Sequence, residues 1–245
     1  MPNLKLTIEY DGTDYAGWQT QHAKHRTIQQ VIEDTLHTIL RQDIKLIGSG
    51  RTDAGVHALG QVANFKTVSS LPVERLKKAL NALLPDDIVI RSIEEVEPSF
   101  HSRFSAKTKA YRYAILNRDH PSALLRTRVH FCPHPLDIAR MKKEASCLLG
   151  RHDFKAFQAS SKREKNPVKT IKKLAIRREG DVIYFDIEAD GFLYNMVRNI
   201  VGTLIEAGRG KFEKGYLKKL LLSKDRKLAG PTAPAKGLCL MKVGY

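Results

Sequence analysis

Apolar and polar positions alternate in some stretches of this chain and recur every three or four residues in others. Alternation predicts half-buried β-strands, whereas the longer spacing predicts amphipathic helices. Over the first half, the pattern predicts a strand at 4–10, a helix at 27–40, strands at about 44–48 and 61–66, a helix at 72–84 and a strand that starts at residue 88. Thr27 suits the N-cap of the first helix, and Pro72 suits the start of the second.

The second half repeats this order of elements. Its pattern predicts a strand at 109–115, a helix at about 136–149, strands at 171–178 and 182–189, a helix from 193 to about 207 and a strand near 238–243. Strand–helix–strand–strand–helix–strand therefore occurs about twice, although the halves share negligible residue identity. The order predicts an α+β protein of two related ferredoxin-like α/β halves, with mostly antiparallel sheets side by side and helices packed on one face. We expect domains at 1–107 and 108–245.

Basic charge is concentrated in the second half. The chain of 245 residues has a formal net charge of +16. Of its 42 lysines and arginines, 13 lie in residues 1–108 beside 13 acidic residues, and 29 lie in residues 109–245, again beside 13 acidic residues. Clustered lysine and arginine bind polyanions by releasing their counterions. The second half is therefore predicted to bind nucleic acid.

Other features narrow the class of protein. Cys132, Cys147 and Cys239 are widely spaced, so they indicate neither a disulfide framework nor a zinc site. The first residues pass into the strand at 4–10 without the apolar core of a signal peptide, and no apolar run approaches the length of a bilayer-spanning helix. We therefore expect a cytoplasmic protein that does not enter a membrane.

The loop at residues 50–58, with the sequence GRTDAGVHA, combines two glycines with three ionisable side chains. It runs directly into the strand at 61–66. A carboxylate close to a guanidinium on such a loop suits a nucleophile or an acid–base group, which makes Asp53 and Arg51 candidate site residues. Taken alone, however, the Asp-Ala-Gly sequence is explained at least as well by an ordinary turn, because aspartate and glycine dominate turns.

Two residues of the second half are further candidates. Arg198 lies in the first turns of the helix at 193–207, where the helix dipole disfavours a cation, so a nearby carboxylate would offset the cost. The alternative is a solvated arginine on the polar face. Tyr111 lies on the strand at 109–115, where an aromatic ring either packs in the core or stacks on an exposed base.

Two irregular stretches have no predicted helix or strand. Residues 98–108 form a polar crossing between the halves and carry two aromatic side chains. Residues 159–167 belong to the basic half. They suit either a solvated surface loop or a loop that grips phosphate.

Several of these segments together resemble the TruA family of tRNA pseudouridine synthases. The resemblance rests on residues 50–58 (GRTDAGVHA), 109–113 (KAYRY) and 191–202 (GFLYNMVRNIVG), with further support from 10–19 (YDGTDYAGWQ) and 166–171 (NPVKTI). It covers essentially the whole chain in order. The loop at 160–165 departs from the family, which often carries a cysteine or small residues there. This departure bears on tRNA preference rather than on the reaction.

The resemblance implies an isomerase that breaks the N-glycosidic bond of a uridine, turns the uracil and rejoins it through C5. It implies that Asp53 is the nucleophile and that Arg198 pairs with it. Arg51 would hold the target nucleotide out of the stem, and Tyr111 would pack on the uracil. The implied substrate is uridine at positions 38, 39 and 40 of the tRNA anticodon stem-loop. The resemblance also implies a homodimer that needs no cofactor or metal and grips one tRNA across both subunits.

Two other functions fit parts of the sequence. A non-catalytic tRNA-binding module would explain the charge and the aromatic residues but not the ionisable loop. Metal-dependent hydrolysis through Asp53 and His57 would rest on only two ligands, which is a weak metal pattern. The residues leave open whether Asp53 attacks C1′, attacks C6 or promotes a glycal intermediate. They also leave open which base removes the C5 proton, although Tyr111 is placed to relay it.

Overall fold

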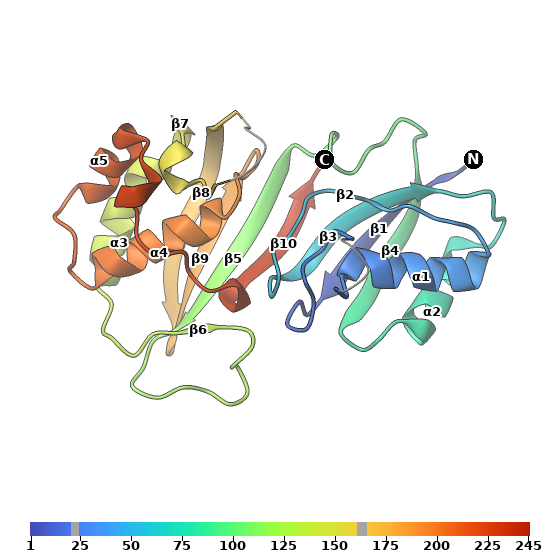
Figure 1. Cartoon of the computed structure of the whole chain (residues 1–245), viewed down its shortest axis with the longest axis horizontal. Coiled ribbons are helices and arrows are strands. Elements are labelled where there is room, and N and C mark those ends of the chain that lie inside the picture. Colours follow the sequence, from blue (N-terminus) through green and yellow to red (C-terminus); the bar gives the residue numbers. More distant parts are fainter. Residues whose placement is uncertain (21–24, 161–165) are drawn as a thin grey trace. The chain divides into compact units, whose positions relative to one another are not determined.

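Two compact units make up the described chain. The computed structural model describes residues 1–20, 25–160 and 166–245. One unit consists of Met1–Lys107 together with Cys239–Tyr245, and the other consists of Thr108–Leu238. Figure 1 labels the helices and strands of each unit.

The last strand belongs to a different unit from the one that the sequence predicts. The prediction assigned all of residues 108–245 to one domain. β10 (Leu238–Gly244) pairs in parallel with β3 (His57–Lys66), and Cys239 lies opposite His57. Its residues from Cys239 onward therefore belong with the first unit. The order of elements along the chain could not show this, because it does not determine which strand a terminal strand pairs with.

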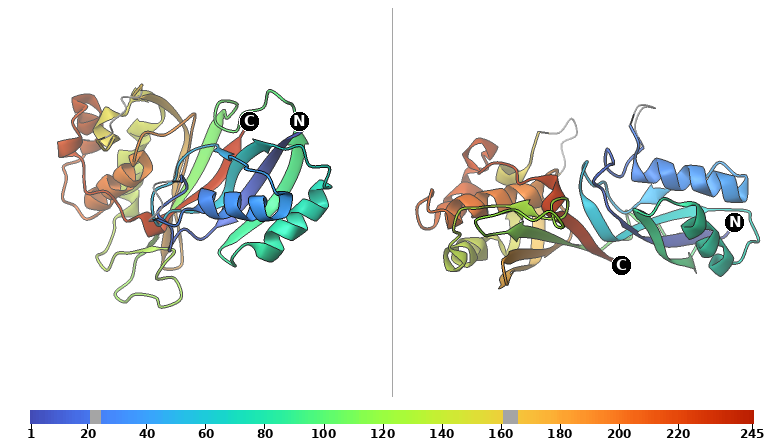
Figure 2. Two further views of the ribbon diagram at one scale, coloured as in Figure 1. Left: turned by 45° about the vertical axis from the view of Figure 1, so that its right-hand side comes forward. Right: turned by 90° about the horizontal axis from the view of Figure 1, so that it is seen from below.

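The first unit is a mostly antiparallel sheet with two helices. Its elements are β1 (Asn3–Tyr10), α1 (Ile28–Leu40), β2 (Ile47–Gly48), β3 (His57–Lys66), α2 (Val73–Leu83) and β4 (Ile88–Val96). The strands β4, β1, β3 and β2 lie in this order and pair antiparallel. The helices α1 and α2 contact each other, and Figure 2 shows them side by side. This chain order with antiparallel pairing is a ferredoxin-like arrangement.

Alternation along β1 explains how this sheet buries its core. Leu4, Leu6 and Ile8 are almost completely buried on one face of the strand. The apolar stripe of α1, which includes Ile32 and Leu36, is equally buried. The helix starts where the sequence predicts, because the side chain of its N-cap, Thr27, accepts a hydrogen bond from a backbone N–H of the first turn.

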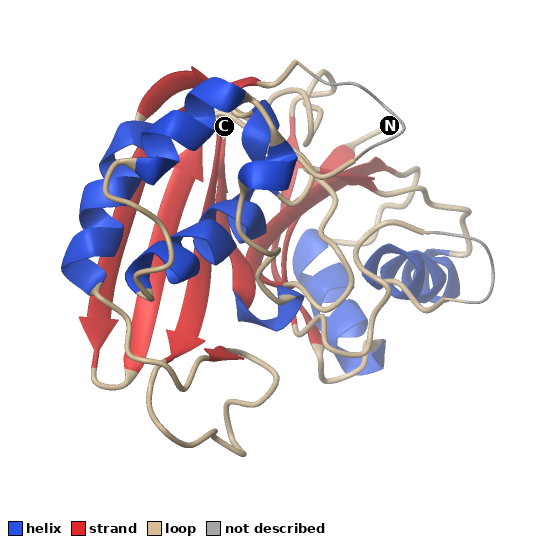
Figure 3. Cartoon of the chain, turned by 60° about the vertical axis from the view of Figure 1, so that its left-hand side comes forward, coloured by secondary structure: helices blue, strands red, loops and turns tan. Residues whose placement is uncertain are grey.

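The second unit is likewise built on mostly antiparallel strands. Its main elements are β5 (Thr108–Leu116), β6 (His130–Phe131), α3 (Ile138–Ala145), β7 (Gly150–Asp153), β8 (Val168–Glu179), β9 (Val182–Ala189), α4 (Met196–Gly208) and α5 (Tyr216–Ser223). The strands β5, β9, β8 and β7 lie in this order and pair antiparallel, while β6 pairs with β5 in parallel. Figure 3 shows the helices of this unit over one face of its sheet. The predicted α+β class with mostly antiparallel pairing is therefore confirmed.

Some boundaries differ from the predictions for local reasons. The predicted strand at 44–48 is reduced to β2, because the Leu46 N–H donates to the buried Glu33 carboxylate at 2.8 Å instead of to a strand. The helix predicted to start at 193 starts at Met196. The sequence pattern did not predict β6 or β7, since strands of two and four residues show too few periods to recognise. It also did not predict α5.

Close backbone packing fixes the position of α4 in the second unit. A Cβ atom at Gly202 would overlap the Pro231 carbonyl group. In the next residue, the Thr203 hydroxyl accepts the Gly230 N–H at 3.0 Å. The helix therefore lies directly on the backbone of residues 230–231, and only glycine at position 202 permits this approach.

Gly202→Ala is expected to destabilise the protein by about 2 kcal/mol or more, because the added methyl group must separate two backbones. The midpoint of urea unfolding measures this effect. Gly191→Ala is the matched control, since a Cβ there would contact only the Lys169 side chain, at 3.8 Å. Equal unfolding midpoints for the two variants would contradict the close packing at α4.

Candidate active site

The loop that carries Asp53 is a tight turn between β2 and β3. The Val56 N–H donates to the Asp53 carbonyl at 3.2 Å. Gly55 adopts a φ of 75°, a left-handed conformation that favours glycine. Asp53 is half-buried, whereas Arg51 is exposed. The stretch is therefore a turn, as its composition indicates, and Asp53 is the residue at which that turn starts.

Two buried polar side chains hold the beginning of this loop against the sheet. The Ser49 N–H donates to the Val62 carbonyl at 2.7 Å, and the Ser49 hydroxyl donates to Gln61 Oε1 at 2.7 Å. Gln61 Nε2 donates to the Gly50 carbonyl at 3.0 Å. Neither Ser49 nor Gln61 has exposed area. These hydrogen bonds satisfy polar groups that the loop buries, and they fix the point at which the loop leaves the sheet.

The segment that follows β1 holds the loop at Thr52. The Trp18 N–H donates to the Thr52 carbonyl at 3.1 Å, and the Tyr10 and Thr52 hydroxyl oxygens lie 2.8 Å apart. Gly17, with a φ of 93°, comes so close that a Cβ there would lie 2.5 Å from the Thr52 carbonyl oxygen. Thr52 is therefore fixed through both its main chain and its side chain, and Asp53 follows it directly.

His57 joins the end of the loop to the same segment. Its side chain is 10% exposed, and Nδ1 accepts the Gly12 N–H at 3.1 Å. Asp11 Oδ1 also lies 3.0 Å from this nitrogen. These contacts give His57 the role of a loop anchor. Among the described residues, no three His, Cys, Asp or Glu side chains are grouped closely enough to hold a metal ion.

Arg198 is held by hydrogen bonds at the start of α4. Its Nε donates to the Ala233 carbonyl at 2.7 Å, and its Nη1 donates to Asn195 Oδ1 at 3.1 Å. Asn195 precedes the helix in a left-handed conformation, with a φ of 57°. The two oxygen acceptors offset part of the unfavourable interaction between the cation and the helix dipole. Arg198 is therefore held by protein acceptors as well as being partly accessible to solvent.

The two tyrosines of β5 have different surroundings. Tyr113 has no exposed area, and its hydroxyl donates to the Pro234 carbonyl at 2.8 Å. Burial raises the pKa of Tyr113, so its hydroxyl remains protonated at neutral pH. Tyr111 is only half-buried, and its ring meets the Phe192 ring edge-on with centroids 5.2 Å apart. Tyr113 is therefore the core residue, and Tyr111 keeps part of its ring accessible.

The four predicted site residues belong to both units. Arg51 and Asp53 lie on one loop of the first unit. Tyr111 and Arg198 belong to the second unit, in which β5 and α4 contact each other. Each unit therefore contributes two of the four predicted residues.

The residues that hold the Asp53 loop were not identified from the sequence. Trp18, Gly17 and Gln61 carry no reactive group, so a search for chemistry passes over them. The available signal was the stretch at 10–19, rich in glycine and aromatic residues, which belongs to the family resemblance. Its function as a support for the loop depends on a contact between residues some forty positions apart.

The loop at 159–167 is described only at its ends, because residues 161–165 lie outside the described residues. The Ala159 N–H donates to the Tyr194 carbonyl at 3.0 Å. Tyr194 directly precedes Asn195, whose side chain accepts a hydrogen bond from Arg198. One end of this loop is therefore attached next to a predicted site residue.

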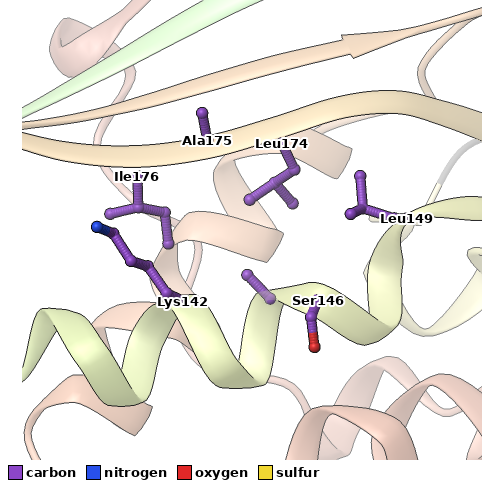
Figure 4. A pocket seen from close by; sticks show the side chains of 7 residues that line it. Lys142, Ser146, Leu149, Leu174, Ala175 and Ile176 are labelled. Carbon is purple, nitrogen blue, oxygen red and sulfur yellow. The ribbon is translucent and has the colours of Figure 1, made fainter.

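A cavity of about 290 Å³ lies between α3 and β8 in the second unit (Figure 4). Leu149, Leu174 and Ile176 line it together with Lys142. None of the four predicted site residues lines this cavity. Within the described part of the chain, no helix has the length and apolar character needed to cross a bilayer.

Comparison with known proteins gives a consistent result over the whole chain. The family model described as tRNA pseudouridine synthase matches residues 6–105 and 145–245. A tRNA pseudouridine synthase A from Acetivibrio thermocellus is 51% identical over 245 residues, covering 100% of both chains. With the same coverage, tRNA pseudouridine synthase A 2 from Clostridium perfringens is 50% identical, and tRNA pseudouridine synthase A from a Thermoanaerobacter species is 48% identical.

The chain therefore belongs to the tRNA pseudouridine synthase family. It is an isomerase that converts uridine to pseudouridine in tRNA. The resemblance seen in the sequence is confirmed. The chain is an isomerase rather than a non-catalytic tRNA-binding module or a metal-dependent hydrolase.

Gly17→Ala is expected to lower kcat at least about ten-fold while the protein stays folded, because the new methyl group displaces Thr52 and with it Asp53. Steady-state kinetics on tRNA measures the effect. Gly215→Ala is the control, since Gly215 has a similar φ of 80° but no atom within 4 Å of a built Cβ. Both variants carry backbone strain, so an equal loss of activity in the two would contradict the role of the Thr52 contacts.

Proposed function

We propose that Asp53 is the catalytic carboxylate and nucleophile of this isomerase, and that its targets are uridines 38, 39 and 40 of the tRNA anticodon stem-loop. The observation that carries the proposal is the way Thr52 is fixed by Trp18 and Tyr10, which positions the next residue accurately. Catalytic groups need such positioning, because misplacement by about 1 Å can cost 100-fold in rate.

The reaction conserves the atoms of the nucleoside. The N1–C1′ bond breaks, the uracil turns, and a C5–C1′ bond forms. The C5 proton is then lost and N1 gains a proton. A carboxylate assists these steps only while it is ionised, and an arginine beside a carboxylate favours that form. Attack at C1′, attack at C6 and promotion of a glycal are all compatible with an aspartate in this position.

The other site residues take complementary roles in the proposal. Arg198 pairs with Asp53, and its hydrogen bonds to Ala233 and Asn195 leave its guanidinium preorganised for this purpose. Tyr111 packs on the uracil with the accessible part of its ring. Arg51 holds the target nucleotide out of its stack, as an exposed cation beside the turn can do. In this proposal Tyr111 is also a candidate to relay the C5 proton.

The charge distribution supports a division of labour between the two parts of the chain. The nearly neutral first half supplies the carboxylate, and the basic second half supplies most of the phosphate contacts. We include in the proposal that two copies form a homodimer and grip one tRNA together, that no cofactor or metal takes part, and that the enzyme works in the cytoplasm.

Asp53→Asn is expected to abolish tritium release from tRNA labelled at uracil C5, because the amide cannot act as a nucleophile or a base. Binding of tRNA should stay within about two-fold of the unmodified protein, since the two side chains are nearly isosteric. A filter-binding assay measures affinity, and the tritium assay measures turnover. Normal turnover by the Asn variant would show that another group carries the reaction.

The same variant identifies the target positions in cells. Pseudouridine mapping in tRNA from cells that lack this protein should show unmodified uridine at 38, 39 and 40. Restoring the unmodified gene should return the modification, and restoring the Asp53→Asn gene should not. Pseudouridine that persists at these positions without the protein would overturn the assigned targets.

Arg198→Lys is expected to lower kcat about 100-fold, because lysine cannot reproduce the fork that bonds to Ala233 and Asn195 while presenting a further N–H group. Single-turnover rates on labelled tRNA measure this loss. Arg209→Lys, at the other end of α4, is the control, because Arg209 pairs with Glu206 and is not part of the proposed site. Similar rates for both variants would remove Arg198 from the site.

A further inference from the structure

The segment between the two halves carries an exposed aromatic cluster at residues 101–104. The side chain of Phe104 is 76% exposed. The His101 ring lies beside it with centroids 4.3 Å apart, and the Arg103 guanidinium carbon lies 5.6 Å from the Phe104 ring centroid. A single exposed ring is common on protein surfaces. The Phe104 ring differs from such single rings because the turn that carries it is firmly held by hydrogen bonds.

Buried polar groups hold the turn from below. Ser102 is fully buried, its N–H donates to Asn64 Oδ1 at 2.9 Å, and its hydroxyl donates to the Ile47 carbonyl. The Tyr245 hydroxyl donates to the Ser102 carbonyl at 2.8 Å. Asn64 is itself 3% exposed and donates to Asn3 Oδ1 at 2.9 Å. A buried network in which the members satisfy one another makes this turn rigid.

The turn also orders its own exposed residues. His101 Nδ1 lies within hydrogen-bonding distance of the Arg103 N–H, at 3.2 Å, and of the Phe104 N–H, at 3.3 Å. The Ser105 hydroxyl accepts the His101 N–H at 3.2 Å. The Phe104 ring is therefore presented outward by a backbone that is already in place. A preorganised contact loses less conformational entropy when it binds a partner than a mobile one does.

The turn is attached to the element that leads to Asp53. Ile47, which accepts the hydrogen bond from Ser102, is the first residue of β2. Asp53 follows Ile47 by six positions along the chain, a distance of roughly 20 Å at most. The turn and Asp53 belong to the same compact unit. One RNA molecule bound at Asp53 can therefore also reach Phe104.

We propose that His101, Arg103 and Phe104 form a stacking platform for an unstacked base of the tRNA substrate, outside the target uridine. The proposal rests on the proposed function, because it assumes that tRNA binds across the Asp53 loop. Phe104 offers a π-face to any of the four bases, and Arg103 adds a positive charge for the adjoining phosphate. A base fits this surface better than a protein partner does, since Arg103 and the nearby Lys107 are both exposed and positive.

Phe104→Ala tests the platform. Base stacking on an aromatic ring is strong enough that its loss should raise the Kd for tRNA about ten-fold. At saturating tRNA the turnover rate should stay within about two-fold, because Phe104 does not touch the reacting uridine in this proposal. Phe104→Trp should restore affinity, since tryptophan stacks equally well. Leu83→Ala is the matched control, because Leu83 is a 57% exposed apolar residue of the same unit.

Fluorescence gives a readout that does not depend on turnover. The chain has one tryptophan, Trp18, which is 2% exposed, so a tryptophan at position 104 reports separately on the exposed site. In Asp53→Asn/Phe104→Trp, titration with tRNA should quench the emission of the exposed indole to saturation. The Asp53→Asn variant without the second change provides the background signal.

Three results would overturn the platform: no quenching by tRNA, an unchanged Kd in Phe104→Ala, or dissociation of a dimer by Phe104→Ala in sedimentation. The last would show that the ring covers a protein surface rather than a base. Failure of the proposed nucleophile is separate from these results. It would appear as turnover by Asp53→Asn, while quenching at position 104 could still occur.

Discussion

The double attachment of Thr52 is the interaction on which the proposed active site depends. A reactive carboxylate gains from an accessible position, but an accessible loop loses accuracy unless its backbone is fixed nearby. Thr52 meets both requirements, because the Trp18 N–H donates to the Thr52 carbonyl and the Tyr10 hydroxyl lies within hydrogen-bonding distance of the Thr52 hydroxyl. Asp53 then follows a residue that is 8% exposed and cannot move freely.

Fixed hydrogen-bond partners play the same part in the second unit. Arg198 lies at a helix start, where the dipole opposes its charge. The Ala233 carbonyl and the Asn195 side chain stabilise it there, and the close approach at Gly202 keeps α4 on the segment that includes Pro231. Both halves of the proposed site thus use ordinary backbone and side-chain bonds to hold a charged group in a fixed direction.

β2 connects two features that the sequence shows separately. It delivers the loop that carries Asp53, and through Ile47 it accepts the hydrogen bond that fixes the turn below Phe104. β2 itself is only two residues long, because the Leu46 N–H donates to the Glu33 carboxylate rather than to a neighbouring strand. A short strand with buried polar partners on both sides is a rigid support, since each of its neighbours restricts the same few residues.

The sequence by itself determined the α+β class, most helices and strands, the family, and the candidates Arg51, Asp53, Tyr111 and Arg198. Those features depend on local periodicity and on short motifs. Only the tertiary structure decided that residues 239–245 join the first unit, that the segment at 10–18 supports the loop, and that Tyr113 rather than Tyr111 is the core tyrosine. The physical reason is that strand pairing, burial and hydrogen bonding between distant residues depend on which elements meet, and periodicity along one chain does not contain that information.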